Sequence, residues 1–331
     1  MRIAINGFGR IGRIFLRNIL DRPGIAVVAI NDLADTQTLA HLFKYDSVHQ
    51  RFKGTIDFDR DNLFVNNQNI KVLTEKEPQA LPWKALGIDL VIESTGKFTS
   101  RQAAMGHLEA GAKQVIISAP STDKSVPTVV LGVNDGLVDL RSQILSNASC
   151  TTNNVAAMIK VLDDNWGIVD GYITTVHSMT GDQSLHDSPH KDLRRARAAS
   201  ASIIPTTTGA AKAITTIFPH LEGRLGGAGI RVPVLNGSLT DLTCSLKKQA
   251  TVEAINSAFK QVAEGAMRNI LEYTEDPIVS ADIIGNTHSC IFDARLTSIV
   301  GGLVKVVGWY DNEMGYSSRL ADLVERIGLL S

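Results

Sequence analysis

Cysteine, aromatic residues and long apolar runs are all scarce in this sequence. Of its 331 residues only three are cysteines, and aromatic residues make up 5%. Cys150, Cys244 and Cys290 show no CxxC or other metal-ligand spacing, which argues against a zinc centre and a disulfide framework, so no metal is expected. A sparse, odd cysteine count fits a reducing compartment, where a single thiol can act as a nucleophile.

An excess of charge of either sign is also missing. Lys and Arg number 33 against 34 Asp and Glu, which leaves a net charge of −1. This balance argues against a general attraction to nucleic acid or anionic membranes. No uninterrupted run of about 18 apolar residues occurs, and the N-terminus reads as a strand and turn rather than a signal peptide. We expect a soluble, cytoplasmic protein with no membrane or nucleic-acid partner.

Strands and helical patterns alternate through the first half of the chain. The predicted strands are short β-branched runs, namely Ile3–Ile5, Val27–Ile30, Leu90–Ile92, Val115–Ile117 and Ile144–Leu145. Helical patterns such as Arg10–Leu20 and Arg101–Gly111 lie between them. This alternation predicts an α/β fold with a parallel sheet covered on both faces. The stretch Arg51–Leu73 predicts an inserted antiparallel hairpin.

The pattern changes from about Cys150 onward. A helix is predicted over Asn154–Leu162 and a strand over Tyr172–Val176, followed by a long polar and basic segment, Ser178–Ser202. Further elements are predicted as helices over Ala210–Phe218 and Val252–Met267, strands over Leu239–Leu246 and Leu303–Trp309, and an amphipathic helix at the C-terminus. At about 150 residues per domain, the length predicts two domains.

A glycine-rich motif stands near the N-terminus. Gly7-Phe8-Gly9-Arg10-Ile11-Gly12 follows a predicted strand and opens a helical pattern. Its glycines allow a tight turn and close backbone approach to a pyrophosphate. Asp32 ends the second predicted strand about 20 residues further on, where an acceptor for ribose hydroxyls belongs and where a 2′-phosphate would be repelled. The motif therefore predicts NAD rather than NADP, against the alternative of a plain tight turn with a capping Asp.

Cys150 is the candidate nucleophile. It lies in a Ser/Thr/Asn-rich turn between an apolar run and a helical pattern, whereas Cys244 and Cys290 lie in apolar surroundings. A helix N-terminus stabilises a thiolate, so we expect a lowered pKa for Cys150. The same N–H groups could hold an oxyanion. His177 ends a predicted strand and is the candidate base.

Anion-binding groups gather in the second half of the chain. The basic segment carries several cations but no aromatic residue for base stacking, which argues against an RNA-binding patch. Thr206-Thr207-Thr208-Gly209 leads into a helix, and Arg231 follows. These groups suit a phosphorylated substrate, and a thiol beside NAD suits oxidation of an aldehyde through a thiohemiacetal and a thioester. Inorganic phosphate could then take the acyl group.

Four runs spread over the chain resemble the phosphorylating, NAD-dependent glyceraldehyde-3-phosphate dehydrogenase family. They are Ile5–Arg13, Ala148–Asn153, Thr207–Lys212 and Trp309–Glu313. The resemblance implies a Rossmann domain over residues 1–149, completed by a C-terminal helix over 315–331, and a mixed-sheet catalytic domain over 150–314. It also implies a homotetramer in which residues 178–202, the S-loop, line the NAD site across a subunit contact. The implied reaction, shared by glycolysis and gluconeogenesis, converts glyceraldehyde 3-phosphate, NAD and inorganic phosphate to 1,3-bisphosphoglycerate.

The resemblance also implies roles for individual residues. The catalytic pair would be Cys150 and His177. The residues that would bind substrate or inorganic phosphate are Ser149, Thr151, Thr180, Asp182, Arg194, Thr208, Gly209 and Arg231. Those that would contact NAD are Asn6, Gly7, Gly9, Arg10, Ile11, Gly12, Asp32, Lys76, Thr95, Gly96, Ser118 and Asn312. Arg195 and Arg197 remain alternatives to Arg194.

Three positions depart from the family pattern. Asn154 stands where a second cysteine is frequent, and Lys76 replaces a frequent arginine near the adenine. By the family resemblance, NAD-preferring members have a Leu-Pro pair where this chain has Ser188 and a proline. Loss of the leucine side chain could admit some NADP. Alternatives are erythrose-4-phosphate dehydrogenase, a semialdehyde dehydrogenase, and a nucleic-acid-binding or regulatory protein on the same scaffold. The Thr-Thr-Gly run argues against the first, and intact Cys150, His177 and Asp32 argue against the last.

Overall fold

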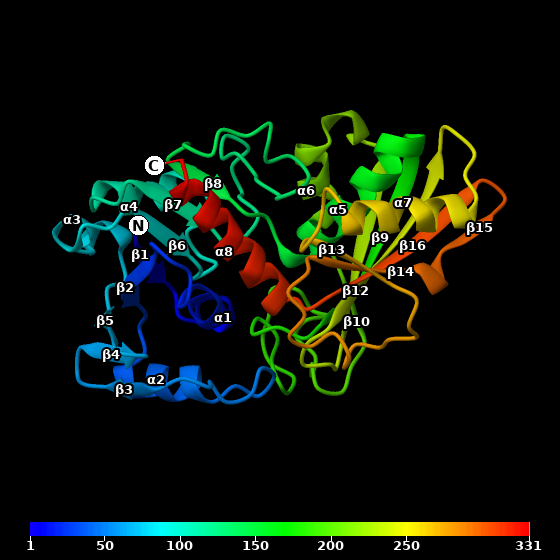
Figure 1. The fold of residues 1–331 in the computed structure, drawn as a ribbon. Coiled ribbons are helices and arrows are strands. Elements are labelled where there is room, and N and C mark those ends of the chain that lie inside the picture. Colours follow the sequence, from blue (N-terminus) through cyan, green and yellow to red (C-terminus); the bar gives the residue numbers. More distant parts are fainter. Residues whose placement is uncertain (331) are drawn as a thin grey trace. The chain divides into compact units, whose positions relative to one another are not determined.

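The computed structural model describes residues 1–330, and the chain divides into two compact units (Figure 1). The first consists of Met1–Val129, Asp135–Ala148 and the chain from Leu320 onward, and the second of Val130–Asn134 and Ser149–Arg319. Helix α8 (Met314–Gly328) therefore begins in the second unit and ends in the first. Ser331, the last residue of the predicted C-terminal helix, lies outside the described residues.

The first unit is built on an eight-stranded sheet. In spatial order its strands are β3 (Ile56–Phe58), β4 (Asn62–Val65), β5 (Gln68–Leu73), β2 (Ala26–Asn31), β1 (Arg2–Asn6), β6 (Leu90–Glu93), β7 (Gln114–Ile117) and β8 (Ile144–Ser146). From β5 to β8 every neighbouring pair is parallel. The β3–β4 and β4–β5 pairs are antiparallel, so the predicted inserted hairpin is confirmed, and its last strand also extends the parallel sheet.

The helices of the first unit connect these strands. They are α1 (Arg10–Ile19), α2 (Thr36–Lys44), the 3₁₀ turn η1 (Pro78–Ala80), α3 (Trp83–Leu86) and α4 (Arg101–Glu109). The end of α8 is tied to this unit by Arg22, which lies 2.6 Å from both Asp322 and Glu325. Helix α2 was not predicted, although Asp35 caps it by accepting from the N–H of Thr38.

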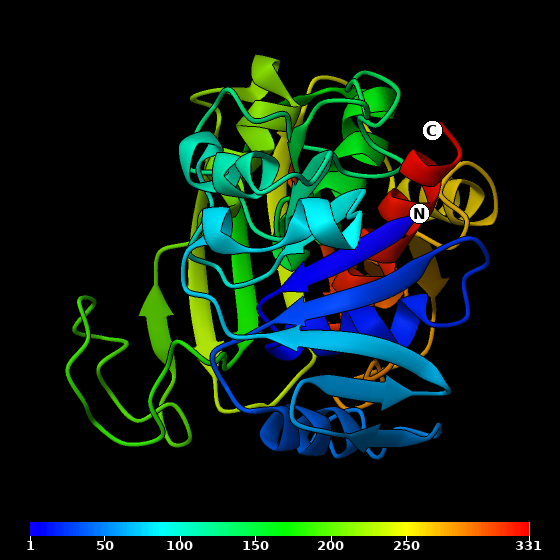
Figure 2. The same cartoon turned by 90° about the vertical axis from the view of Figure 1, so that its left-hand side faces the viewer.

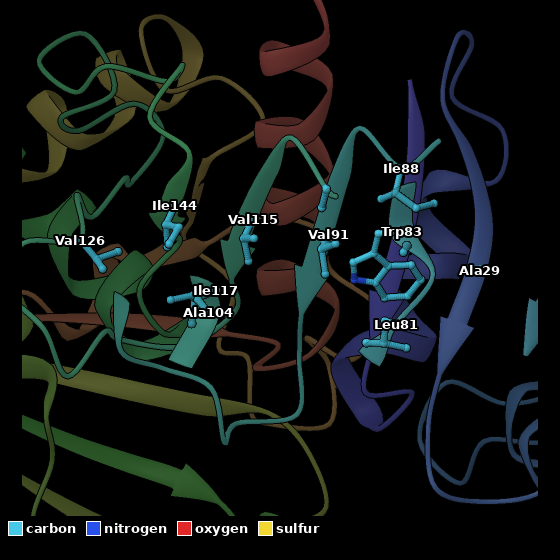
Figure 3. Close-up of a cluster of buried hydrophobic side chains, with 12 residues drawn as sticks. Ala29, Leu81, Trp83, Ile88, Val91, Ala104, Val115, Ile117, Val126 and Ile144 are labelled. Carbon is cyan, nitrogen blue, oxygen red and sulfur yellow. The ribbon is translucent and has the colours of Figure 1, made fainter. Parts of the chain in front are cut away.

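One core cluster lies between the parallel sheet and helices α3 and α4. Figure 3 shows Trp83 beside Val91, with Val115, Ile117 and Ile144 further along the same side of the sheet. All of these side chains are fully buried. Burying one such side chain is worth roughly 1.5–3 kcal/mol, so the cluster stabilises the packing of the sheet against these helices.

The second unit has a mixed sheet, also eight-stranded. Its main path runs β10 (Ile204–Thr206), β11 (Leu225–Val232), β9 (Ile168–Ser178), β12 (Ser238–Leu246), β16 (Leu303–Tyr310), β14 (Cys290–Asp293) and β13 (Leu271–Thr274), with β15 (Ser298–Val300) beside β16. The β11–β9 and β13–β14 pairs are parallel, and the other pairs are antiparallel. The predicted mixed sheet is confirmed.

Helices cover one face of this second sheet. They are α5 (Cys150–Trp166), α6 (Ala210–Ile217) and α7 (Val252–Glu264), and short turns η2 (Pro219–Leu221) and η3 (Ala294–Leu296) complete the unit. Helix α5 packs on β9, β12, β14 and β16 and is buried over most of its length. A helix that is buried on all sides needs no exposed polar face, and this explains its run of small and apolar residues.

The S-loop, residues 178–202, connects β9 to β10 without regular structure beyond its first residue. Figure 2 shows it as the irregular green chain beside the short edge strand. Hydrogen bonds within the segment fold it back on itself, since Ser188 donates its N–H to Ala196 and Ala199 donates to Ser184. Within residues 1–330, no helix combines the length and apolar character that crossing a membrane requires.

Candidate active site

Helix α5 begins at the candidate nucleophile. Ser149 is its N-cap residue, and its hydroxyl accepts a hydrogen bond from the N–H of Thr152 at 3.1 Å. The preceding residue, Ala148, is buried and has φ of 54°, a left-handed conformation that is uncommon for a residue with a Cβ. Such backbone conformations cluster at functional sites. Together the capped start and the turn before it place Cys150 in the first turn of the helix.

Strand β9 presents His177 to this cysteine. Sγ of Cys150 and Nε2 of His177 lie 3.6 Å apart. Arg231 on β11 is the direct register partner of His177, because β11 and β9 pair in parallel. The structure thus brings together the predicted nucleophile, the predicted base and a cation, all within the second unit.

The other ring nitrogen of His177 determines what Nε2 can do. Nδ1 lies 2.7 Å from the carbonyl oxygen of Ser178 and 2.6 Å from Nη1 of Arg231. Arg231 also donates to the same carbonyl at 3.1 Å. When Nδ1 carries the proton and donates to Ser178, Nε2 is an acceptor facing the thiol, and the approach of Arg231 to Nδ1 then joins two donors and is no hydrogen bond. This tautomer is the one that a general base requires.

Burial controls the protonation of both groups. Burial, followed by the positive charge of Arg231, lowers the pKa of His177 to about 4. Burial also raises the pKa of the Cys150 thiol, although Arg231 and the N–H of Thr151 act in the opposite direction. The expected lowering of the thiol pKa is therefore wrong for this structure, because desolvation outweighs the helix start. His177 is neutral at pH 7 and available as a base.

A charged network adjoins the pair. The Thr180 hydroxyl donates to Asp182, and Asp182 lies 2.7 Å from Nη1 of Arg195. Burial opposes ionisation of Asp182, but the Thr180 hydroxyl and the cations Arg231 and Arg195 lower its pKa overall. Arg195 also donates to the Thr206 hydroxyl at 3.0 Å, whereas the side chain of Arg194 is exposed. The structure places Arg195, rather than Arg194, in contact with residues of the predicted phosphate site.

Two of the predicted phosphate-site hydroxyls are engaged within the protein. Ser149 caps α5, and the hydroxyls of Thr151 and Tyr310 lie 2.9 Å apart. Tyr310 is buried at the end of β16, with its ring edge-on to His177 at 6.1 Å. The sequence did not indicate a site role for Tyr310. Its only signal was its position two residues before Asn312. The remaining candidates, Thr208 and Gly209, stand at the start of α6, where the N-cap Gly209 offers no side chain and the Thr208 hydroxyl accepts from the N–H of Ala210 at 3.2 Å.

The glycine-rich turn lies in the first unit, between β1 and α1. Gly7 has φ of +92°, and a Cβ on it would lie 2.7 Å from the backbone nitrogen of Thr95. A Cβ on Gly12 would lie 2.3 Å from the carbonyl oxygen of Gly7, so both positions require glycine. Gly9 instead faces open space, and α1 starts there without a side-chain cap. An open, uncapped helix start fits the pyrophosphate of a dinucleotide.

Other predicted cofactor residues stand at the carboxyl ends of the parallel strands, where α/β sheets bind ligands. Asn6 ends β1, Asp32 follows β2, Thr95 and Gly96 follow β6, and Ser118 follows β7. Asp32 accepts from the N–H of Phe8 at 2.8 Å and from that of Ala34 at 3.1 Å. Its carboxylate therefore braces the glycine-rich turn, a contact that the sequence did not reveal.

Three further candidates in the first unit differ in their surroundings. Arg10 pairs with Asp46 at 2.5 Å, and this carboxylate is held by the N–H groups of His49 and Val48. Although burial opposes it, these bonds and Arg10 lower the pKa of Asp46 to about 2. Ile11 is half-buried, and Lys76 is exposed after β5. Among residues 1–330, no group of His, Cys, Asp or Glu could hold a metal ion.

Comparisons with known proteins cover nearly the whole chain. A sequence model of the NAD-binding domain of glyceraldehyde 3-phosphate dehydrogenase matches residues 1–101, and one of its C-terminal domain matches residues 149–312. The glyceraldehyde-3-phosphate dehydrogenase of Mycobacterium avium is 55% identical over 99% of this chain and 98% of its own length. The chain belongs to the glyceraldehyde-3-phosphate dehydrogenase family. The enzyme of Mycobacterium tuberculosis H37Rv, at 53%, and glyceraldehyde-3-phosphate dehydrogenase 2 of Streptomyces avermitilis, at 51%, match over the same shares of the chains.

Membership of this dehydrogenase family confirms the resemblance, the two-part fold and NAD as the cofactor. Asn312, a predicted NAD contact, lies just after β16. Oδ1 of Asn312 accepts from the hydroxyls of Ser178 at 2.9 Å and Ser238 at 3.1 Å. With its oxygen held by two donors, Asn312 has its amide nitrogen left to donate.

Proposed function

We propose that this chain carries out the phosphorylating oxidation typical of its family. Glyceraldehyde 3-phosphate, NAD and inorganic phosphate are converted to 1,3-bisphosphoglycerate, NADH and a proton. The observation that carries this proposal is the 3.6 Å approach of Cys150 Sγ and His177 Nε2, with Arg231 beside the same imidazole. A nucleophile, a base and a cation together suit covalent attack on an aldehyde that carries a phosphate.

The roles of the residues follow from their positions. The Cys150 sulfur adds to the aldehyde carbon as its proton passes to His177 Nε2, and the N–H groups at the start of α5 receive the developing oxyanion. Arg231 binds the phosphate of the substrate, and the Thr180 hydroxyl joins it by turning its one proton from Asp182 to the phosphate. Bound NAD supplies the acceptor for the hydride that leaves the thiohemiacetal carbon. The product of that step is a thioester on Cys150.

Inorganic phosphate completes the reaction. One of its oxygens attacks the thioester carbon, the carbon–sulfur bond breaks, and the sulfur takes back a proton through His177. We assign the phosphate to the start of α6, at Thr208 and Gly209, together with Ser149 and Thr151. Arg194 is the cation that the family resemblance favours, and Arg195 is the alternative because it bonds to Thr206, two residues before Thr208.

We also propose that the protein works as a cytoplasmic homotetramer. Three apolar side chains that flank or belong to the S-loop region, Leu185, Leu193 and Ile203, are each more than two-thirds exposed. Exposed apolar groups of this kind are typical of surfaces that another protein covers. All three cysteines are free, which fits a reducing compartment. Light scattering coupled to gel filtration would measure the assembly, and a monomer at micromolar concentration would contradict it.

An assay of NADH formation tests the reaction itself. The aldehydes are glyceraldehyde 3-phosphate, erythrose 4-phosphate and a phosphate-free semialdehyde, each with and without inorganic phosphate. We expect the first to have the highest kcat/KM and to depend on inorganic phosphate for turnover. Higher kcat/KM with erythrose 4-phosphate would establish the sister activity instead. Phosphate-independent turnover of the semialdehyde would remove the role given to Thr208 and Gly209.

A further inference from the structure

A chain of buried polar side chains lies beneath the glycine-rich turn of the first unit. Trp83 from α3, His107 from α4, Glu93 at the end of β6 and Asn6 at the end of β1 are each at least 98% buried. None of them reaches the surface, so each polar atom must find its partner inside the protein. A buried polar network destabilises the fold unless each of its polar atoms has a hydrogen-bond partner. Its presence here therefore suggests a role beyond packing.

Trp83 fixes the tautomer of His107. Nε1 of Trp83 donates to Nδ1 of His107 at 3.0 Å. Because an indole N–H can only donate, Nδ1 is the unprotonated nitrogen and the ring proton sits on Nε2. Nε2 lies 3.1 Å from Oε2 of Glu93, so His107 donates to Glu93. The 3.4 Å separation of Nε2 from Asn6 Nδ2 then joins two donors and is no hydrogen bond.

Glu93 gathers donors on both of its oxygens. Oε2 accepts from Asn6 Nδ2 at 2.6 Å as well as from His107. Oε1 accepts from the backbone N–H of Thr95 at 2.9 Å and from the Thr95 hydroxyl. Every one of these partners donates, so both carboxylate oxygens of Glu93 are held by donors from three residues. The turn after β6 is thus bonded to a carboxylate whose far side is held by His107.

The same turn supports the glycine-rich loop. The Ser94 hydroxyl donates to the carbonyl oxygen of Gly7 at 2.6 Å, and a Cβ on Gly7 would lie 2.7 Å from the backbone nitrogen of Thr95. The two backbones are in direct contact at this point. Asn6 adds a second connection, because its Oδ1 accepts from Asn31 at the end of β2 at 2.7 Å. A shift of Glu93 would therefore move three strand ends and the Gly7 turn together.

We propose that His107, oriented by Trp83, is a positioning residue for NAD binding: it holds Glu93 so that the Thr95 turn and the Gly7 loop keep the shape that receives the dinucleotide. This role rests on the proposed use of that loop for NAD. His107 itself touches no ligand in this scheme. Its effect passes through the bond to Glu93, and the bond to Trp83 serves to keep the proton on the correct nitrogen.

Two amide substitutions test separately the hydrogen bonds of His107 to Glu93 and to Trp83. In His107→Gln the longer amide places a nitrogen near the position of Nε2, where it can donate to Glu93. In His107→Asn the shorter amide places an oxygen near the position of Nδ1, where it can accept only from Trp83. Calorimetric titration of the full-length protein with NAD gives Kd for each, and thermal unfolding gives Tm. The rate of Cys150 alkylation reports whether the second unit is intact.

We expect His107→Asn to weaken NAD binding roughly tenfold or more, because the bond that holds Glu93 in place is lost. His107→Gln is expected to stay within about threefold of wild type, and both are expected to keep the wild-type alkylation rate. If both variants lose stability equally and bind NAD like the wild type, the network is purely structural and the proposal is wrong. It is also wrong if the Asn variant binds NAD better than the Gln variant.

Trp83→Phe provides the test should His107→Asn not fold. It keeps an aromatic side chain in the core but removes the donor to Nδ1 together with part of the ring volume, so Tm is measured beside Kd, and we expect NAD affinity to fall several-fold. NAD affinity equal to wild type in that variant would overturn the role of Trp83. Absence of NAD binding by the wild type would instead contradict the proposed function, and so the two failures are distinguishable.

Discussion

Helices α1 and α5 both begin at a strand's carboxyl end, yet their starts are built differently. α1 begins after Gly9, with open space above the glycine and no side-chain cap. α5 begins after Ser149, whose hydroxyl already occupies the N–H of Thr152. A bare start keeps donors available for a ligand, whereas a capped start is rigid and presents the side chain of Cys150. The N-cap residue thus distinguishes a helix start that is left open from one that is rigid and positions a nucleophile.

The sharpest way to break this comparison is to remove the thiol. We expect Cys150→Ser to lose at least about 10⁴-fold in NADH production, because a serine hydroxyl beside a neutral imidazole is a much weaker nucleophile. NAD binding should be nearly intact, since α1 is untouched. Cys244→Ala is the matched control, because burial raises the pKa of that thiol to about 12 and it has no assigned role. Substantial turnover by Cys150→Ser would end the thioester mechanism.

Loss of the base is expected to have the next largest effect. His177→Asn should slow the chemical step by roughly 10²–10⁴-fold. Because the pKa of His177 is about 4, the wild-type imidazole is neutral from pH 5 upward and is lost as a base only when the pH falls through that value. In the variant the contact of the imidazole with the thiol is lost, so alkylation of Cys150 should be slower at neutral pH than in the wild type and should rise at a higher pH. Identical alkylation profiles for the two proteins would show that the pair does not act together.

Two glycines test the bare start of α1. Gly12→Ala places a Cβ against the Gly7 carbonyl, so we expect a loss of ~1–3 kcal/mol in stability together with NAD affinity. Gly9→Ala meets nothing within the protein and should fold with a Tm near wild type. It should nevertheless bind NAD about tenfold more weakly, because the added methyl occupies the space above the helix start. Unchanged NAD affinity in Gly9→Ala would show that the ligand does not approach there.

The parts of the fold that could be predicted from the sequence are those with local signals. The parallel strands, the glycine-rich turn and Asp32 are local signals, and the structure places the turn and Asp32 at the carboxyl ends of those strands. Strand β11 has no recognisable strand pattern in the sequence, because its glycines are required by contacts with residues distant in the chain. A Cβ on Gly226 would lie 2.7 Å from the Tyr172 ring, and one on Gly227 would lie 3.2 Å from Ala211. Only the folded sheet reveals why that run is a strand.

The same limit applies within the active site. Cys150 and His177 were recognisable from their places at a helix start and a strand end. Tyr310 was not, because its bond to Thr151 joins residues 159 positions apart. The protonation of the thiol was also misjudged, since burial depends on everything packed around it. Sequence patterns identify reactive groups, while their electrostatics come from tertiary packing.

Cofactor choice offers a milder test of the first unit. Asp32 would repel a 2′-phosphate, and a like-charge clash costs several kcal/mol, so we expect a clear preference for NAD with detectable NADP activity. Asp32→Ala should raise relative use of NADP but also weaken NAD binding, because the acceptor for the Phe8 N–H is lost. Asp32→Asn keeps an acceptor and should separate the two effects. Steady-state kcat/KM for both cofactors measures them, and wild-type preference for NADP would show that Asp32 does not face the ribose.

The smallest expected effect concerns Ser188 in the S-loop. Its hydroxyl lies 2.5 Å from that of Ser184, and the family resemblance suggests an apolar side chain here as a guard against NADP. A leucine contact is worth at most about 1.5–3 kcal/mol, less than the charge effect of Asp32. Ser188→Leu should therefore lower relative NADP use, but by less than Asp32→Ala raises it. Ser184→Ala removes the same hydroxyl pair without adding apolar surface and is the control. If Ser184→Ala changes the NADP/NAD ratio of kcat/KM as much as Ser188→Leu does, the effect at Ser188 comes from disruption of the loop and not from an apolar contact.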